Sequence, residues 1–467
     1  VTGTQDQATV AGGPLAGGIK HALVGSLMIT IAATIISVPI GLLTSIWLVE
    51  YSRGGWLASD TPCAWFGVSC AAGRVTALDL SDNQLSGNLP ANLGDLASLE
   101  RLSLANNQLS GPLPASLVAL AELQVLDLAD NDLQGSLPAE LGSLTRLQTL
   151  QVWGNELSGE LPISLGALVN LRTLALSGNQ LTGSIPAGLG NLASLQELNL
   201  ANNRLSGAIP ASLGGLTNLR RLALSGNQLS GPIPAALGHL ASLQQLWLDR
   251  NQLSGEIPAQ LGGLASLRGL GLSVNRLSGA VPAELAGLAR LQELWLASNQ
   301  LEGSLSDAWC NLTDLIFLDM GFNMLTAAPA CLDLADPFWH ESQTVAPAGL
   351  QAEVHAQGDV LLTWTPIAFR TGVGAYEVSF RPAGGDYAVH GQTIDKAVSS
   401  YTVSGLAPGV TYEFCLRTFS AARNEPPANQ QSDLWSSYTQ AVSATTPGGS
   451  PARYLRLPLV EISRQAQ

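Results

Sequence analysis

The residue types that most often bind metals or act as catalytic bases are few in this chain and far apart. The five histidines are His21, His239, His340, His355 and His390. None lies at metal-ligand spacing from another histidine or from a cysteine, as a zinc site requires. No glycine-rich phosphate loop follows a strand pattern. We therefore expect no metal site, no cofactor and no enzymatic activity.

The five cysteines point to disulfide chemistry instead. Cys310 and Cys331 flank the last unit of a sequence repeat and are candidates for a disulfide. Cys415 lies in an alternating apolar stretch, which favours a buried free thiol over a reactive one. Paired cysteines indicate an oxidising compartment, whereas the alternative is a cytosolic protein with reduced core cysteines.

One asparagine recurs every 24 residues, and this period defines the elements that position the other side chains. Such a strict period predicts a solenoid of stacked units. A solenoid presents a long, shallow surface, so we expect recognition of another molecule. The asparagines are Asn83, Asn107, Asn131, Asn155, Asn179, Asn203, Asn227, Asn251, Asn275, Asn299 and Asn323.

Each unit carries Leu-x-x-Leu-x-Leu-x-x-Asn-x-Leu-Ser-Gly-x-Ile/Leu-Pro-x-x-Leu-Gly-x-Leu, as in residues 195–216. The alternating Leu-x-Leu predicts a short strand whose leucines point inward. The asparagine is expected to satisfy backbone groups of its own turn and of the neighbouring coil. Gly87 and its equivalents suit a positive φ or close packing. Pro90 and its equivalents suit an extended segment outside the hydrogen-bonded ladder.

This pattern resembles the plant-type leucine-rich repeat over residues 56–335. The resemblance implies an α/β solenoid with a parallel sheet on its concave face, in a family best known from receptor ectodomains. Trp56-Leu57 and residues 62–70 resemble the N-terminal cap of such arrays. In that family the two cap cysteines form a disulfide, which carries over here to Cys63 and Cys70.

Residues 22–49 contain no charged side chain. As a helix they would extend about 40 Å, more than the ~30 Å hydrocarbon core of a bilayer. They therefore predict one transmembrane helix. Trp47 and Tyr51 suit the membrane interface, while the flanking charges do not fix the orientation.

The same N-terminal region resembles one helix of the permease subunit of phosphate ABC transporters, over residues 10–54. The resemblance rests on Val38-Pro39-Ile40-Gly41-Leu42-Leu43 and Glu50-Tyr51-Ser52-Arg53-Gly54. In that family the Glu-Tyr-x-Arg end faces the cytoplasm, which would place the repeats on the reducing side. The cap cysteines imply the opposite side, and we give them more weight.

Residues 345–447 predict a β-sandwich, with strands at Val360–Trp364, Tyr376–Phe380, Ser400–Val403 and Tyr412–Phe419. Residues 346–350 and 406–412 resemble a fibronectin type III domain. In that family a tryptophan fills the core and a tyrosine forms the tyrosine corner, here Trp364 and Tyr412. A spacer or adhesion module is favoured over a dedicated ligand site, because no Arg-Gly-Asp triplet occurs.

Strand parity selects the solvent side of the main sheet, since the residue between the two leucines and those just outside them face outward. Large aromatic and charged residues stand out there, and exposed tryptophan is enriched at binding hot spots. The alternative is that the tryptophans pack on one another along the sheet. The ligand-binding candidates are Trp153, Glu197, Asn199, Arg221, Trp247, Asp249, Glu293, Trp295 and Phe317.

We predict a membrane-anchored, extracytoplasmic recognition or adhesion protein that binds a protein, peptide or glycan. The formal net charge of −14 argues against nucleic acid as a partner. The alternatives are a permease-derived fragment fused to repeats, and an intracellular repeat scaffold. The expected domains are an N-terminal segment (1–54), a repeat cap (55–74), repeats with a C-terminal cap (75–335), a fibronectin type III module (345–447) and a tail (448–467).

Overall fold

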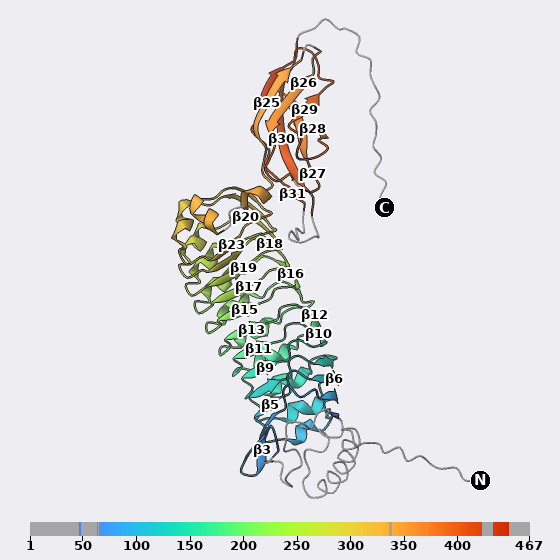
Figure 1. The fold of residues 1–467 in the computed structure, drawn as a ribbon, viewed down its shortest axis with the longest axis vertical. Helices are drawn as coiled ribbons and strands as arrows, with labels where there is room; N and C mark the ends of the chain where they lie inside the picture. The colour runs from blue at the N-terminus through green and yellow to red at the C-terminus, as the bar shows by residue number, and fades with distance from the viewer. Residues whose placement is uncertain are drawn as a thin grey trace, which may run out of the picture. The chain divides into compact units, whose positions relative to one another are not determined.

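The computed structural model describes residues 46–47, 63, 65–335, 339–355, 357–370, 372–422 and 433–447. The chain divides into two units, whose elements Figure 1 draws. The first unit holds the described residues up to Leu296 together with Leu305–Asp319 and Pro329–Ala335. The second unit holds Ala297–Ser304, Met320–Ala328 and the described residues after Asp336.

A sheet of twelve short strands runs through the first unit. From β3 onward every neighbouring pair is parallel, while β2 joins β3 as an antiparallel hairpin. The predicted parallel sheet is therefore confirmed. Its strands are β2 (Val68–Ala71), β3 (Arg74–Asp79), β5 (Arg101–Ser103), β7 (Val125–Asp127), β9 (Thr149–Gln151), β11 (Thr173–Ala175), β13 (Glu197–Asn199), β15 (Arg221–Ala223), β17 (Gln245–Trp247), β19 (Gly269–Gly271), β21 (Glu293–Trp295) and β23 (Phe317–Asp319).

The leucines of each coil form the core of the solenoid. In the coil of β13, Leu195, Leu198, Leu200, Leu205 and Leu213 have no exposed surface. One coil cannot bury these side chains alone, so stacking on both neighbours supplies the apolar contact that holds the array together.

A second row of short strands follows the recurrent asparagines. Within the first unit β4 pairs with β6 and β6 with β8, β10 with β12, and β14 through β20 in series, all in parallel; β22 pairs with β24 in the second unit. Gly87 (φ 93°), in the middle of β4, and Gly207 (φ 77°), at the end of β14, have a positive φ, as predicted. The strands are β4 (Ser86–Asn88), β6 (Gln108–Pro112), β8 (Asp132–Gln134), β10 (Ser158–Glu160), β12 (Gln180–Thr182), β14 (Ser206–Gly207), β16 (Gln228–Gly231), β18 (Gln252–Glu256), β20 (Arg276–Ala280), β22 (Gln300–Ser304) and β24 (Met324–Ala327).

The helical segments of the coils are 3-10 helices, so the α part of the expected α/β class is replaced by 3-10 turns in the described residues. The motif Pro-x-x-Leu-Gly-x-Leu places leucines three apart, and residues three apart eclipse in a 3-10 helix. Pro210 precedes η7 in an extended conformation (φ −66°, ψ 128°). The segments are η2 (Leu93–Asp95), η3 (Ala115–Ala119), η4 (Ala139–Ser143), η5 (Ile163–Ala167), η6 (Ala187–Asn191), η7 (Ala211–Gly215), η8 (Ala235–His239), η9 (Ala259–Gly263), η10 (Ala283–Gly287), η11 (Asp307–Asn311), η12 (Ala330–Leu334) and η13 (Trp339–Ser342).

Close stacking of these 3-10 segments requires a glycine without a side chain. A Cβ added to Gly214 would lie 2.3 Å from the carbonyl oxygen of Ala236 in the next coil. Gly142 and Gly238 meet the next coil in the same way. Glycine in Leu-Gly-x-Leu therefore sets how closely the coils approach.

The asparagines form a buried ladder, as the sequence predicts. The N–H of Leu205 donates to Oδ1 of Asn227 at 3.0 Å. The Nδ2 of Asn227 donates to the carbonyl oxygens of Leu200 and Leu224, both at 3.0 Å. Because Leu200 lies one coil earlier, each amide joins two coils through groups that water cannot reach.

Disulfides stand near both ends of the repeats. Cys63 is joined to Cys70, the pairing that the family resemblance implies, and Cys310 is joined to Cys331. In the second unit Gln343 takes the place of the next ladder asparagine. Its Oε1 accepts from the N–H of Leu325 at 3.0 Å, and its Nε2 donates to the carbonyl oxygen of Met320 at 3.0 Å.

The C-terminal part of the second unit is a sandwich of two antiparallel sheets, one of β25, β26 and β29 and the other of β28, β27, β30, β31 and β32. Four of its strands match those predicted. The hydroxyl of Tyr412 accepts from the N–H of Ala407 at 3.1 Å, which is the predicted tyrosine corner, and Trp364 lies in the core. The strands are β25 (Ala348–Val354), β26 (Val360–Thr365), β27 (Gly374–Pro382), β28 (Ala388–Gln392), β29 (Ser400–Val403), β30 (Thr411–Ser420), β31 (Leu434–Trp435) and β32 (Val442–Thr445).

Cys415 is the free cysteine of the described residues, and it is buried, as predicted. Burial raises the pKa of its thiol, so the group is protonated and inert near neutral pH.

The predicted transmembrane helix falls almost wholly outside the described residues. The exception is β1 (Ile46–Trp47), which pairs antiparallel with β4, so the helix predicted over 22–49 is wrong at these two residues. Where the structure describes the chain, none of its helices is long and apolar enough to cross a bilayer.

Candidate functional site

The outer face of the main sheet carries the candidate binding residues in register. Trp247 of β17 lies opposite Gly271 of β19, which lies opposite Trp295 of β21. Gln245, Gly269 and Glu293 form the neighbouring column. Because parallel strands with a fixed period keep each column aligned, the sequence order of the coils becomes the spatial order of the side chains.

Trp247 lies over the two glycines of the next strand. A Cβ on Gly269 would lie 2.7 Å from Cη2 of Trp247, and one on Gly271 would lie 2.5 Å from Cε3. The glycines are buried although their positions point outward, because the indole covers them. The half-buried indole is thus seated in a fixed position on the sheet.

Trp295 packs on Phe317 of the following strand. Their ring centroids are 3.8 Å apart with an interplanar angle of 27°. The Nε1 of Trp295 donates to Oε2 of Glu293 at 3.4 Å. Phe317 remains 37% exposed and the adjacent Ile316 77% exposed, so this end of the face presents apolar surface.

Glu197 and Arg221 form an ion pair across neighbouring strands, with Oε1 and Nη1 3.6 Å apart. Both side chains are partly open to solvent, so the pair orients the guanidinium and adds little stability. Asn199, on the same strand as Glu197, accepts from the N–H of Ala201 at 3.2 Å.

Asp249 is a partly buried charge of the face. Its carboxylate accepts from the N–H of Ser273 at 2.9 Å and from the hydroxyl of Ser225 at 3.3 Å. Burial raises the pKa of Asp249 above its ordinary value, and the hydrogen bonds from Ser273 and Ser225 oppose that shift. The carboxylate therefore acts as a fixed acceptor beside Trp247.

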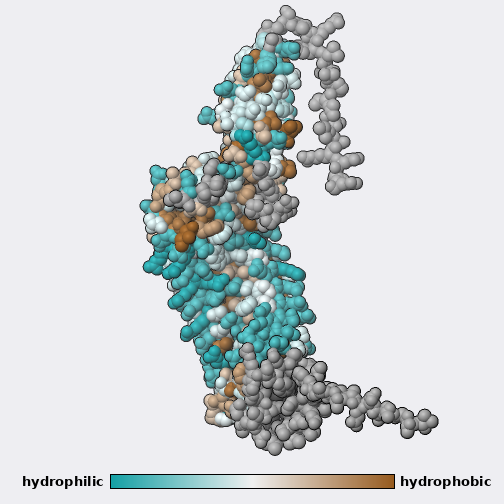
Figure 2. All heavy atoms as spheres, in the orientation of Figure 1, coloured by the Kyte–Doolittle hydropathy of each residue, from teal (hydrophilic) through white to brown (hydrophobic). Residues whose placement is uncertain are grey.

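The structure brings some of the nine candidates together and leaves others apart. Trp247 and Asp249 both adjoin Gly271, and Glu197 meets Arg221. Trp153 follows β9, four coils before Asp249 in the same column, and is 40% exposed. The candidates form an extended row along the sheet face. Figure 2 shows a mainly hydrophilic flank of the repeats, with hydrophobic side chains gathered over the last coils.

Sequence reasoning missed two features of this surface. The glycines Gly269 and Gly271 decide how Trp247 lies, and reading the positions 24 residues after Gln245 and Trp247 would have found them. Three exposed arginines, Arg172, Arg220 and Arg268, recur every 48 residues at the border of the face. Strand parity does not cover them, because they precede the strands.

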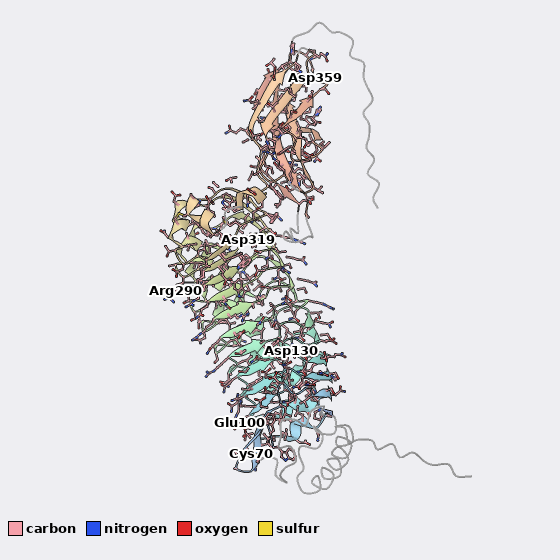
Figure 3. All side chains as sticks on the ribbon, in the orientation of Figure 1. Cys70, Glu100, Asp130, Arg290, Asp319 and Asp359 are labelled. Atoms are coloured by element: carbon pink, nitrogen blue, oxygen red, sulfur yellow. A yellow bond between two sulfur atoms is a disulfide. The ribbon has the colours of Figure 1, made fainter. Side chains whose placement is uncertain are left out.

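Metal-binding groupings are absent from the described part of the chain. No three histidine, cysteine, aspartate or glutamate side chains there lie close enough to hold a metal ion. Figure 3 shows Glu100, Asp130 and Arg290 at separate levels of the repeats.

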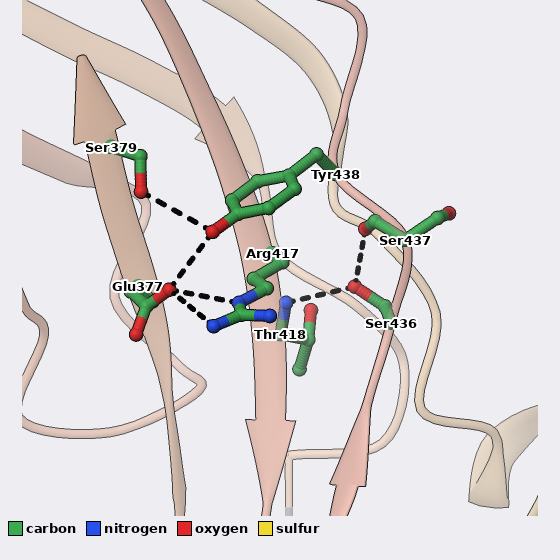
Figure 4. Close-up of polar contacts among 7 residues, drawn as sticks. All are labelled: Glu377, Ser379, Arg417, Thr418, Ser436, Ser437 and Tyr438. Carbon is green, nitrogen blue, oxygen red and sulfur yellow. Dashed lines mark hydrogen bonds and ion pairs between the residues drawn. The ribbon is translucent and has the colours of Figure 1, made fainter. Parts of the chain in front are cut away.

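A second polar cluster lies on one sheet of the sandwich (Figure 4). The Nε and Nη2 atoms of Arg417 both lie 2.8 Å from Oε1 of Glu377, and the hydroxyl of Tyr438 donates to the same oxygen at 3.1 Å. The guanidinium lies 4.1 Å from the ring centroid of Trp435 and 4.9 Å from that of Tyr438. Since every member contacts another member, this cluster stabilises the sheet.

Family models match both parts of the chain. A leucine-rich repeat region matches residues 126–232 and 162–335, and a leucine rich repeat matches 73–133. A fibronectin type III domain matches residues 345–433. The chain belongs to the leucine-rich repeat proteins and carries a fibronectin type III domain.

Two curated proteins share short stretches with the chain. The brassinosteroid LRR receptor kinase BRL3 of Oryza sativa is 60% identical over 52 residues, which are 10% of this chain and 4% of that protein. The phosphate transport system permease protein PstA of Mycobacterium leprae is 46% identical over 46 residues, 10% of this chain and 15% of that protein. The chain thus spans a small part of either relative.

Solved structures of plant receptors resemble the repeats. The LRR ectodomain of the membrane receptor kinase GASSHO1/SCHENGEN3 from Arabidopsis thaliana, in complex with CASPARIAN STRIP INTEGRITY FACTOR 2, is 38% identical with a TM-score of 0.58 and covers 64% of this chain. The Arabidopsis receptor kinase HAESA, in complex with the peptide hormone IDA and a co-receptor, is 40% identical with a TM-score of 0.57 and covers 63%. The chain spans 35% and 50% of these two structures.

Proposed function

We propose that this protein recognises an extended protein or peptide segment through the outer face of its main sheet. The observation that carries the proposal is the row of aromatic and charged side chains held in register on β13 to β23. Aromatic side chains contribute most at binding hot spots because they remove a large apolar area from water at low entropic cost.

The packing of the two tryptophans on the sheet supports a binding role for their indole rings. Trp247 rests on Gly269 and Gly271, and Trp295 on Phe317, so each indole is already ordered before a ligand arrives. A side chain that is fixed in advance loses less conformational entropy on binding. The outer ring faces then remain available for stacking.

Hydrogen-bonding groups alternate with the aromatic ones. Asp249 accepts beside Trp247, Arg221 offers a donor one coil away, and Glu197 offers an acceptor two coils away. The receptors with similar repeats are described as complexes with a peptide hormone or an integrity factor. That likeness supports a peptide or protein as the ligand class, ahead of a glycan. We assign no catalytic role and no cofactor to the chain.

The proposed location is the outside of a membrane, with the N-terminal segment as a single-pass anchor. Disulfides persist in oxidising compartments, and the structure carries Cys63–Cys70 and Cys310–Cys331. Thiol labelling of the non-reduced protein, followed by peptide mass spectrometry, tests this location. Disulfide-linked peptides are expected. Free Cys63 and Cys70 would support an intracellular repeat scaffold instead.

The ligand proposal is tested by selecting peptides from a random library on the full-length protein and measuring their affinity for variants. Trp247→Ala with Trp295→Ala should weaken the selected peptides at least tenfold, or about 1.4 kcal/mol or more. The control is Ile163→Ala with Val169→Ala, which removes exposed apolar side chains at η5 and the turn after it. Equal affinity of the selected peptides for both double variants would contradict the proposal.

A second candidate function rests on the match to the phosphate permease PstA. The chain would then be a permease-derived segment joined to a repeat domain. Affinity purification from membranes tests it, because such a chain should co-purify with other permease subunits. Purification of the chain without them would remove this candidate.

A further inference from the structure

The border of the main sheet carries a row of arginines with a spacing of two coils. From β9 to β21, the position just before each sheet strand is occupied by glutamine in the coils of Gln148, Gln196, Gln244 and Gln292 and by arginine in the coils between them. The arginine row is Arg172, Arg220 and Arg268, and all three side chains are exposed.

The backbone fixes this alternation as a straight column. The N–H of Gln196 donates to the carbonyl oxygen of Arg172 at 2.8 Å, and that of Arg220 to Gln196 at 2.7 Å. Gln244 and Arg268 continue the series, each at 2.8 Å. Members of the column therefore stand on successive coils with no lateral shift.

The arginine row is not neutralised by the chain itself. Arg221 pairs with Glu197, whereas no member of the row forms an ion pair with any described residue. Residues 172–271 contain six arginines against three carboxylates, a net charge of +3 in a chain of net charge −14. An acidic protein thus concentrates unpaired positive charge beside the proposed binding face.

We propose that the arginine row selects an extended acidic peptide with a carboxylate at every third residue. Neighbouring strands lie about 4.8 Å apart, so arginines two coils apart are about 10 Å apart. A peptide in the extended polyproline II conformation advances about 3.1 Å per residue with three residues per turn, so every third side chain lies on the same side and three residues cover about the same length. Carboxylates at i, i+3 and i+6 of a peptide running along the solenoid would meet Arg172, Arg220 and Arg268.

The glutamines favour a peptide over a sulfated glycan as the occupant. A glutamine side chain offers both a carbonyl acceptor and an amide donor, which matches the alternating N–H and C=O groups of a peptide backbone. Gln196 and Gln244 stand between the arginines and would contact the residues between the carboxylates. This inference rests on the proposed function and names the class of its ligand.

Binding is measured by fluorescence anisotropy on the full-length protein. The probe is a labelled Gly/Ser peptide with aspartate at every third residue, and its isomer has the aspartates contiguous. The test variant is Arg172→Gln, Arg220→Gln and Arg268→Gln together, which places in the row the residue of the adjoining coils. The control is Arg204→Gln, Arg276→Gln and Arg290→Gln, an equal change of net charge at other exposed positions.

The spaced peptide should bind wild type and the control alike, and should bind the row variant about tenfold to a hundredfold more weakly. The contiguous isomer should bind more weakly than the spaced peptide to wild type. Equal weakening by both triple variants would overturn the inference, because net charge alone would then explain binding. Row-dependent binding of a sulfated oligosaccharide without binding of the spaced peptide would also overturn it.

Failure of this inference is distinguishable from failure of the proposed function. Selected peptides whose affinity falls in the tryptophan variant (Trp247 and Trp295) but not in the arginine-row variant would support the proposed function and exclude an acidic ligand. Peptides that ignore the tryptophan variant would remove the proposed function itself.

Discussion

Replacing Asn227 by alanine should destabilise the repeats by an amount that the hydrogen bonds of the ladder determine. The N–H of Leu205 donates to Oδ1 of Asn227 and has no other acceptor among the described residues. Alanine leaves this buried N–H unpaired, which costs about 1–3 kcal/mol.

The carbonyl oxygens that Asn227 serves do not add to this cost. That of Leu200 also accepts from Nδ2 of Asn203 at 3.1 Å, and that of Leu224 also accepts from Nδ2 of Asn251 at 3.0 Å. Each therefore keeps one donor after the single substitution. The neighbouring asparagines thus compensate in part for the loss of one ladder asparagine.

The double variant Asn227→Ala with Asn251→Ala removes that compensation. The carbonyl oxygen of Leu224 loses both of its asparagine donors at once. The loss in free energy of unfolding should exceed the sum of the two single losses by about 1 kcal/mol. The singles should each leave one buried N–H unpaired, that of Leu205 or that of Leu229.

Urea denaturation followed by circular dichroism measures these free energies, and hydrogen exchange at the Leu205 amide locates the effect. Asn218→Ala is the control, because its exposed Nδ2 donates to the carbonyl oxygen of Ala193 at 2.8 Å. It should cost less than about 0.5 kcal/mol. The reasoning is refuted if Asn227→Ala behaves like Asn218→Ala, or if the double variant is strictly additive.

Three further predictions concern stability. Gly214→Ala should cost about 1–3 kcal/mol by forcing a Cβ against the next coil, whereas Gly287→Ala, with nothing within 4 Å, should not destabilise; equal melting temperatures would contradict this. Because burial raises the pKa of Asp249, the contribution of this group to the free energy of unfolding is greatest below its pKa in the unfolded state and is lost as pH rises through its pKa in the folded state. The stability of Asp249→Asn relative to wild type should therefore increase from acid to neutral pH in parallel denaturation curves. A difference in stability that does not change with pH would contradict this prediction. Gln343→Ala should leave the N–H of Leu325 without its acceptor and cost about 1–3 kcal/mol; unchanged amide exchange at Leu325 would disprove its role in ending the ladder.

The features that repeat locally could be predicted from the sequence, because each is decided within one period. Leu198 and Leu200 point inward by strand alternation, and Asn227 had few alternatives to bonding the neighbouring coil. The core Trp364 and the corner Tyr412 followed from the family resemblance. Each depends on spacing along the chain more than on distant contacts.

What could not be predicted depends on the neighbouring coil. Strand alternation places Trp247 on the outer face. The orientation of its indole over Gly269 and Gly271 is possible because these two residues of the next coil have no side chains. The 3-10 form of η7 depends on how closely coils stack, which Gly214 permits. Hydropathy predicts a helix over 22–49, whereas Ile46–Trp47 pair with β4 because strand pairing is decided by the partner.

Recognition through the outer sheet face is tested most directly by hydroxyl-radical footprinting of the full-length protein with and without a selected peptide. The account predicts that bound peptide lowers oxidation of Trp247, Trp295 and Phe317. Oxidation of Tyr387 and Tyr438 on the sandwich, which are also exposed, should stay unchanged. Protection of these tyrosines with no change at the tryptophans would contradict the account and move recognition to the fibronectin type III domain.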